Sequence, residues 1–174
     1  MTGRMKKILW AGLLLFAALA RPAEARAQAY DGDDDWKLCF GYINFGGNSG
    51  LEFTNDYGLS DYFSVGTFAK LLLTGKDRGG DRADLTERLD VGLLFHLHLI
   101  DLMGLPPYLD IYAGPQLGFF NGGLSAGVRY NFSESWGVYA QVHQNLFKVF
   151  DWGDDPSLFK SKFGFSVGIT FNLK

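Results

Sequence analysis

The chain has 174 residues, with 16 Lys and Arg against 19 Asp and Glu, and it contains a single cysteine. Twenty-three glycines, 16% aromatic residues and only five prolines favour strands and tight turns over helices. One cysteine excludes an intramolecular disulfide framework, and the acidic balance argues against the clustered cations that nucleic-acid binding requires.

The N-terminus predicts export. A cationic start is followed by an apolar run from Ile8 to Ala20 and then by overlapping small-x-small triplets. This order is typical of a cleaved signal peptide, and the run is shorter than the roughly 20 residues of a spanning helix. We expect residues 1–27 to be removed, within two residues, by cleavage after Ala27 or Ala29. The remainder carries 11 basic and 18 acidic side chains, a net charge of −7.

After the signal peptide we expect a short leader and one domain. Residues 28–35 form an acidic leader, and we interpret Asp31–Asp35 as a solvated tail rather than a site. Cys39 lies too far from the apolar run to be a lipid anchor, and we expect it to be a small packing residue. The remaining residues, 36–174, are too few for two substantial domains.

Strict alternation of apolar and small or polar residues is the main structural signal. It runs through Leu85–His98, Leu124–Phe132 and Phe163–Leu173. Weaker copies are Trp36–Phe45, Leu51–Leu59, Tyr62–Thr74, Tyr108–Phe119 and Trp136–Phe150. These segments approach or exceed the 9–11 residues of a tilted membrane strand. They predict an all-β protein, an antiparallel up-and-down transmembrane β-barrel of about eight strands.

The two faces of these segments distinguish a membrane barrel from a soluble one. A soluble ligand-binding barrel of the lipocalin type would turn its apolar face inward and cover its outside with long charged side chains. Here the polar face consists largely of Gly, Ser, Thr and Asn, which suit a narrow lumen. We therefore expect the bulky face to contact lipid. An interfacial girdle is expected from aromatic residues near strand ends, namely Tyr57, Tyr62, Tyr108, Tyr130, Phe132, Trp136 and Phe171.

The connections predict an orientation. If the N-terminus starts in the periplasm, the outward connections are Phe45–Gly50, Gly75–Asp84, Phe119–Gly123 and Asp151–Ser157. Two of the inward turns, at Ser60–Asp61 and Ser133–Ser135, are short. The inward connection Leu99–Pro107 is apolar, and we expect it to form a helical turn or a cap at the barrel mouth.

Several segments resemble small outer-membrane barrels of the OmpX, OmpW and opacity types. These are Gly127–Phe132 with Trp136–Ala140, the closing Val167–Leu173, and the turn Tyr57–Gly66. The mature chain as a whole is most similar to an uncharacterised family of such proteins. The resemblance implies an outer-membrane location and recognition of the last strand by the barrel-insertion machinery. Asn172-Leu173-Lys174 extends past Phe171, which departs from the usual aromatic terminus.

The candidate site is a polar network in the lumen. We predict that its members are Glu52, Asp56, Lys70, Arg88, Asp90, His96, His98, Asp110, Arg129, His143 and Lys162. These side chains could form a relay, a gate or a metal site, or could simply neutralise one another inside a narrow barrel. His96 and His98 share a face, but no third ligand is evident nearby. We assign no catalytic, cofactor-binding or metal residues and expect no cofactor and no enzyme activity.

The sequence does not specify a role. We expect a structural or surface-interaction protein with a plugged lumen, embedded in outer-membrane lipid, whose partner at the external loops is unknown. The alternatives are a narrow pore for small solutes and a soluble ligand-binding barrel.

Overall fold

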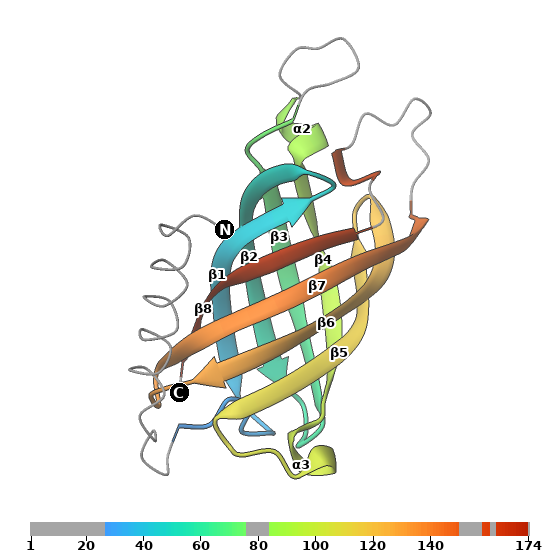
Figure 1. Cartoon of the computed structure of the whole chain (residues 1–174). Coiled ribbons are helices and arrows are strands. Elements are labelled where there is room, and N and C mark those ends of the chain that lie inside the picture. Colours follow the sequence, from blue (N-terminus) through green and yellow to red (C-terminus); the bar gives the residue numbers. More distant parts are fainter. Residues whose placement is uncertain (1–26, 76–83, 150–157, 161–162, 174) are drawn as a thin grey trace, which may run out of the picture.

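The structure is a computed structural model that describes residues 27–75, 84–149, 158–160 and 163–173. Within these ranges eight antiparallel strands follow one another in order and close into a barrel, since β1 pairs with both β2 and β8. The strands are β1 (Trp36–Phe45), β2 (Asn48–Gly58), β3 (Phe63–Leu72), β4 (Leu89–His98), β5 (Leu109–Gly118), β6 (Asn121–Asn131), β7 (Trp136–Lys148) and β8 (Phe163–Asn172). Figure 1 shows them tilted around a common axis. The predicted up-and-down barrel is confirmed.

The two ends of the barrel are marked by short helices (Figure 1). Helix α2 (Leu85–Arg88) lies at one end and α3 (Ile100–Met103) at the other, and we call these the α2 end and the α3 end. The 3-10 turn η1 (Leu158–Lys160) is at the α2 end. Residues 27–35, which precede β1, lie at the α3 end.

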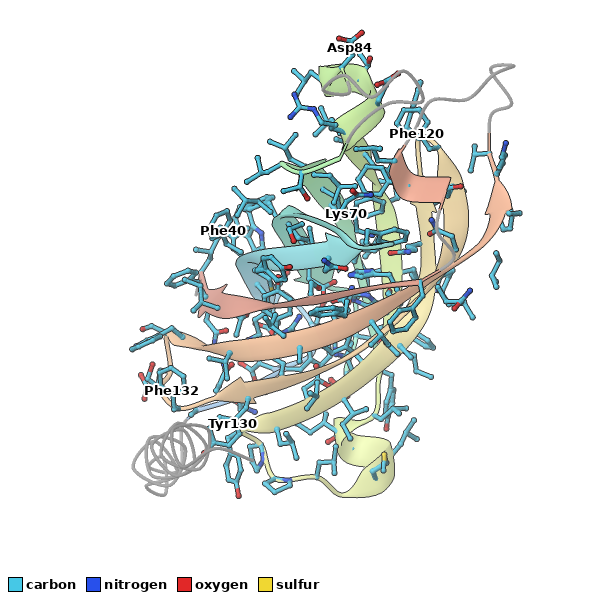
Figure 2. The ribbon with its side chains drawn as sticks, turned by 45° about the horizontal axis from the view of Figure 1, so that its top comes forward. Phe40, Lys70, Asp84, Phe120, Tyr130 and Phe132 are labelled. Carbon is cyan, nitrogen blue, oxygen red and sulfur yellow. The ribbon has the colours of Figure 1, made fainter. Side chains whose placement is uncertain are left out.

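The walls of the barrel carry apolar side chains on the outside and polar ones on the inside. Phe40 points away from the wall while Lys70 points into the interior, as Figure 2 shows. In β4, Leu93 is 57% exposed whereas its near neighbour His96 is 2% exposed. Because side chains alternate along a strand, this single rule divides each wall into two surfaces. No helix in the described ranges is long and apolar enough to cross a membrane.

One predicted strand begins later than expected. Leu85–Arg88 is a helical turn, and β4 starts only at Leu89. The backbone N–H of Asp84 donates to the Glu87 carboxylate at 2.8 Å, which is one half of a capping box. This local signal for a helix start outweighs the alternation that continues through the same residues.

The connections also differ in detail from expectation. The expected loop Phe45–Gly50 is a hairpin of only two residues, Gly46 and Gly47, with φ of 61° and 90°. Both residues need positive φ in such a turn, which glycine adopts without strain. The apolar connection Leu99–Pro107 does contain a helical turn, α3. The expected external loop Asp151–Ser157 and most of Gly75–Asp84 lie outside the described residues.

Candidate functional site

Most of the predicted polar network is located inside the barrel. The structure places nine of its eleven members there, each no more than 4% exposed: Glu52, Asp56, Lys70, Asp90, His96, His98, Asp110, Arg129 and His143. Two groups of contacts can be distinguished along the barrel axis. We call them the Arg129 cluster, nearer the α3 end, and the Lys70 cluster, nearer the α2 end.

Two predicted members do not join them. Arg88 is not in the lumen, because it lies on α2 at the barrel rim, where its Nε donates to the Asp84 carbonyl oxygen at 3.4 Å. The reason is the early helical turn, which removes Arg88 from the alternation of β4. Lys162 lies outside the described residues.

The Arg129 cluster joins opposite walls of the barrel. Arg129 on β6 approaches Asp56 on β2 at 3.3 Å and Asp110 on β5 at 3.6 Å. Its guanidinium also lies over the Tyr112 ring, 4.9 Å from the centroid. His96 contacts the same Asp56 oxygen at 3.2 Å. Since an unpaired buried charge is costly, this pairing allows the charges to be accommodated away from water.

Ser64 and His98 extend the Arg129 cluster through further buried hydrogen bonds. Ser64 donates to Asp56 Oδ1 at 2.6 Å. The two ring nitrogens of His98 face different partners: Nε2 is 2.8 Å from the Ser64 hydroxyl oxygen, and Nδ1 is 2.8 Å from Asp110 Oδ2. His98 therefore connects Ser64 on β3 with Asp110 on β5.

Ser64, His98 and Asp110 are connected in the same way as a serine hydrolase triad. The Ser64 hydroxyl differs from a triad serine in one respect, because it donates to Asp56 and not to His98. Ser64 is also completely buried, so a substrate has no access to its hydroxyl. The arrangement therefore balances charge in the manner of an ion network.

The Lys70 cluster is the second cross-barrel group. Lys70 Nζ on β3 donates to Gln116 Oε1 on β5 at 3.0 Å and lies 3.3 Å from His143 Nδ1 on β7. His143 Nδ1 is also 3.1 Å from Gln116 Oε1, so the three side chains meet at one point, and the other ring nitrogen of His143 is Nε2. That Nε2 is 3.2 Å from Glu52 and 3.1 Å from the Ser166 hydroxyl. Together these contacts link β2, β3, β5, β7 and β8 across the interior.

An apolar layer lies beyond the Lys70 cluster at the α2 end. It consists of Ile43, Phe45, Leu72 and Phe159, each at most 1% exposed. Phe159 comes from η1 and packs edge-to-face against Phe45, with ring centroids 5.5 Å apart. Its carbonyl oxygen accepts hydrogen bonds from the Asn121 and Asn145 side chains at 3.2 and 3.0 Å. We call this group the apolar cap.

At the α3 end, residues 27–35 enter the mouth of the barrel; we call them the N-terminal segment. Within the expected solvated tail, Asp31, Asp33 and Asp34 are exposed, but Asp35 is 1% exposed. Ala29 and Tyr30, which precede the tail, are also at most 4% exposed. Asp35 forms a 2.9 Å ion pair with Lys37, and the Gly58 N–H donates to the Asp35 carbonyl at 2.7 Å. These contacts, made by side chains and main chain together, hold the segment against the β1–β2 wall.

Several lumen residues were missed by the sequence analysis. Four of them could have been found, because each has the same parity as a predicted lumen residue of the same segment: Ser64, Tyr112, Gln116 and Ser166. Lys37 is on β1, where no lumen residue was predicted. Tyr30 and Phe159 lie outside the strands, and no periodic pattern marks them. Within the described parts of the chain, no group of three or more His, Cys, Asp or Glu side chains is arranged to hold a metal ion.

A closed antiparallel barrel with a polar interior and an apolar exterior defines a class, the small β-barrels of the outer-membrane type. The chain belongs to a family of unknown function, DUF6646, whose model matches residues 22–173. No curated protein matches it.

Two solved structures from Pseudomonas aeruginosa share the fold. The N-terminal β-barrel domain of OprF is 13% identical, with a TM-score of 0.52, and covers 82% of this chain and 100% of that one. The outer membrane protein OprG is 14% identical, with a TM-score of 0.52, and covers 84% of this chain and 99% of that one. At these identities the likeness establishes the fold.

Proposed function

We propose that this protein is an exported outer-membrane barrel with a closed lumen, which serves a structural or surface-interaction role. The membrane location is supported by the bulky apolar side chains that are exposed around the outside of the barrel, such as Phe53, Leu93 and Phe165. In a soluble ligand-binding barrel these side chains would fill the interior. The fold shared with the OprF and OprG barrels supports the same location.

Connection lengths support an orientation for the barrel. At the α3 end, residues 59–62 and 132–135 make short turns between strands. The α2 end has the short hairpin at Gly46–Gly47 but also the two longest connections of the barrel, which contain helix α2 and η1. Outer-membrane barrels have short periplasmic turns and longer external loops, so the α3 end faces the periplasm in this proposal. Trp36, Tyr57 and Trp136, all outward-facing at the α3 end, suit the inner interface.

The buried contacts across the interior and at the two ends of the barrel are the observation that supports a closed lumen. The Arg129 and Lys70 clusters cross the interior, the apolar cap covers one mouth and the N-terminal segment occupies the other. Because the paired charges neutralise one another, opening a water-filled path requires separating ion pairs in a low-dielectric interior. Among the proposed partners are outer-membrane lipid and, during assembly, the insertion machinery, whereas catalysis is not part of the proposal.

Planar-bilayer recording of the purified mature protein tests the closed lumen. We expect no reproducible single-channel steps from protein whose insertion is verified by co-flotation with lipid vesicles. The alternative is a narrow pore. It would be established by single-channel steps whose conductance falls in Ser166→Phe, which narrows the lumen, and is unchanged in Arg88→Ala at the rim.

Cell fractionation tests the location. The protein should sediment with outer membranes and require detergent for extraction, because so much of its apolar surface faces outward. A monomeric, folded pool in the periplasm that remains soluble without detergent would contradict the membrane assignment.

A further inference from the structure

The Tyr30 side chain is buried in the mouth at the α3 end of the barrel. Its ring stacks on the His98 imidazole with centroids 3.5 Å apart and an angle of 2° between the planes. Its hydroxyl oxygen is 2.7 and 2.8 Å from the carbonyl oxygens of Ser60 and Phe63, which share its one proton. Burial, followed by the nearby carboxylates, raises the pKa of Tyr30, so the phenol keeps the proton that these bonds require.

The main chain of the N-terminal segment is recognised as well. The Gln28 carbonyl oxygen accepts from Asn131 at 2.7 Å and lies 3.4 Å from the Lys37 ammonium. The Ala29 N–H donates to the Pro107 carbonyl oxygen at 2.8 Å, and the Ala29 carbonyl oxygen is 3.5 Å from Arg129. The donors and acceptors therefore come from β1, β6 and the connection before β5, around the rim of the mouth.

We propose that this mouth is a peptide-binding site whose occupant is the chain's own Gln28–Asp35. The ligand class is an acidic peptide with a turn at Gly32–Asp34 and an aromatic residue two positions after a hydrogen-bonded carbonyl. The aromatic ring stacks on His98, and the carbonyls face Asn131 and Arg129. In the intact protein the segment is tethered directly to β1. A short tether gives an effective concentration on the order of millimolar, so the site is filled in cis and excludes competitors.

The docking is testable with the full mature chain and a fluorescent peptide of residues 28–35. Tyr30→Ala loosens the resident segment, and we expect that variant to bind the labelled peptide saturably, about tenfold or more tightly than the wild-type chain does. A peptide carrying the same Tyr30→Ala change should not bind. The Asp33→Ala chain is the matched control, since Asp33 is exposed, and it should behave as the wild type does. Absence of saturable binding to folded Tyr30→Ala protein would overturn the proposal.

A thiol-labelling experiment with Tyr30 intact covers the outcome in which Tyr30→Ala does not fold. In a Cys39→Ala background, a cysteine introduced at Ala29 should react with maleimide at least about tenfold more slowly than one introduced at exposed Asp33. Equal reactivity at the two positions would overturn the docking. Neither measurement depends on conductance. An open lumen would therefore contradict the proposed function without contradicting the peptide site, and a failure of the peptide site would leave the closed lumen untouched.

Discussion

Arg129 is the side chain on which the buried charge balance depends most. It is 1% exposed, and its guanidinium contacts Asp56, Asp110 and the face of Tyr112. Such a fork of donors can satisfy two carboxylates at once, which a lysine at the same position would do poorly. Without it, Asp56 and Asp110 would have to rely on the two histidines for compensation.

Replacing Arg129 by Met should therefore destabilise the barrel by about 3–5 kcal/mol, the typical cost of removing one partner of a buried ion pair. Urea unfolding of the protein in lipid vesicles measures the change. The control is Arg88→Ala, which should stay within about 0.5 kcal/mol because Arg88 lies on the rim. Similar losses for the two arginines would contradict the placement of Arg129 at the centre of the network. A second change, Asp56→Asn in the Met variant, should recover part of the loss.

At the scale of the strand, the question is which surface meets lipid. Leu93 lies in the middle of β4, facing outward, and Ser125 on β6 faces inward, where its hydroxyl is 3.0 Å from His96 Nε2. The two positions therefore test the two surfaces of the wall separately.

Leu93→Arg should destabilise the folded barrel by about 2–4 kcal/mol, the cost of a cation near the bilayer midplane. Ser125→Thr keeps the hydroxyl and should have a mild effect. Equilibrium unfolding in vesicles compares the two variants. Equal effects, or a larger effect at Ser125, would mean that the assignment of the faces is inverted.

The N-terminal segment makes a prediction about processing. Cleavage after Ala29 would remove the carbonyl oxygens that Asn131 and Arg129 contact, and would leave a new ammonium group close to the Arg129 guanidinium. Cleavage after Ala27 leaves the ammonium on Gln28, which is exposed, and keeps both acceptors. We expect the mature protein to begin at Gln28. The intact mass and N-terminal sequence of protein from outer membranes decide this, and a chain beginning at Tyr30 would contradict the prediction.

At the scale of the whole molecule, closure of the sheet removes open strand edges and also fixes the width of the interior. Each strand pairs with two neighbours, so the wall has no open edge, which lipid would not tolerate. The interior, in turn, is so narrow that glycine is required at close approaches. A Cβ added to Gly127 would lie 2.6 Å from the Tyr112 hydroxyl oxygen. In the proposed structural or surface-interaction role, contacts with other molecules are therefore made at the ends of the barrel.

The sequence by itself determined the barrel class, the approximate strand ranges and the inward or outward direction of most side chains. These properties follow from the two-residue period of a strand, which is a local property of the backbone. The same reasoning put the polar residues of β4, from Asp90 to His98, into the lumen. It failed at Arg88 because a capping signal only a few residues long changed the local backbone from strand to helix.

Only the tertiary structure decided which charges meet. Lys70 and His143 are 73 residues apart, and Asn131 and Gln28 are 103 apart, so their contacts depend on how the closed barrel sets opposite walls. The docking of Tyr30 on His98 and the insertion of Phe159 into the apolar cap depend on segments outside the strands. No periodicity marks such segments, because their positions are set by the shape and charge of the mouths they fill.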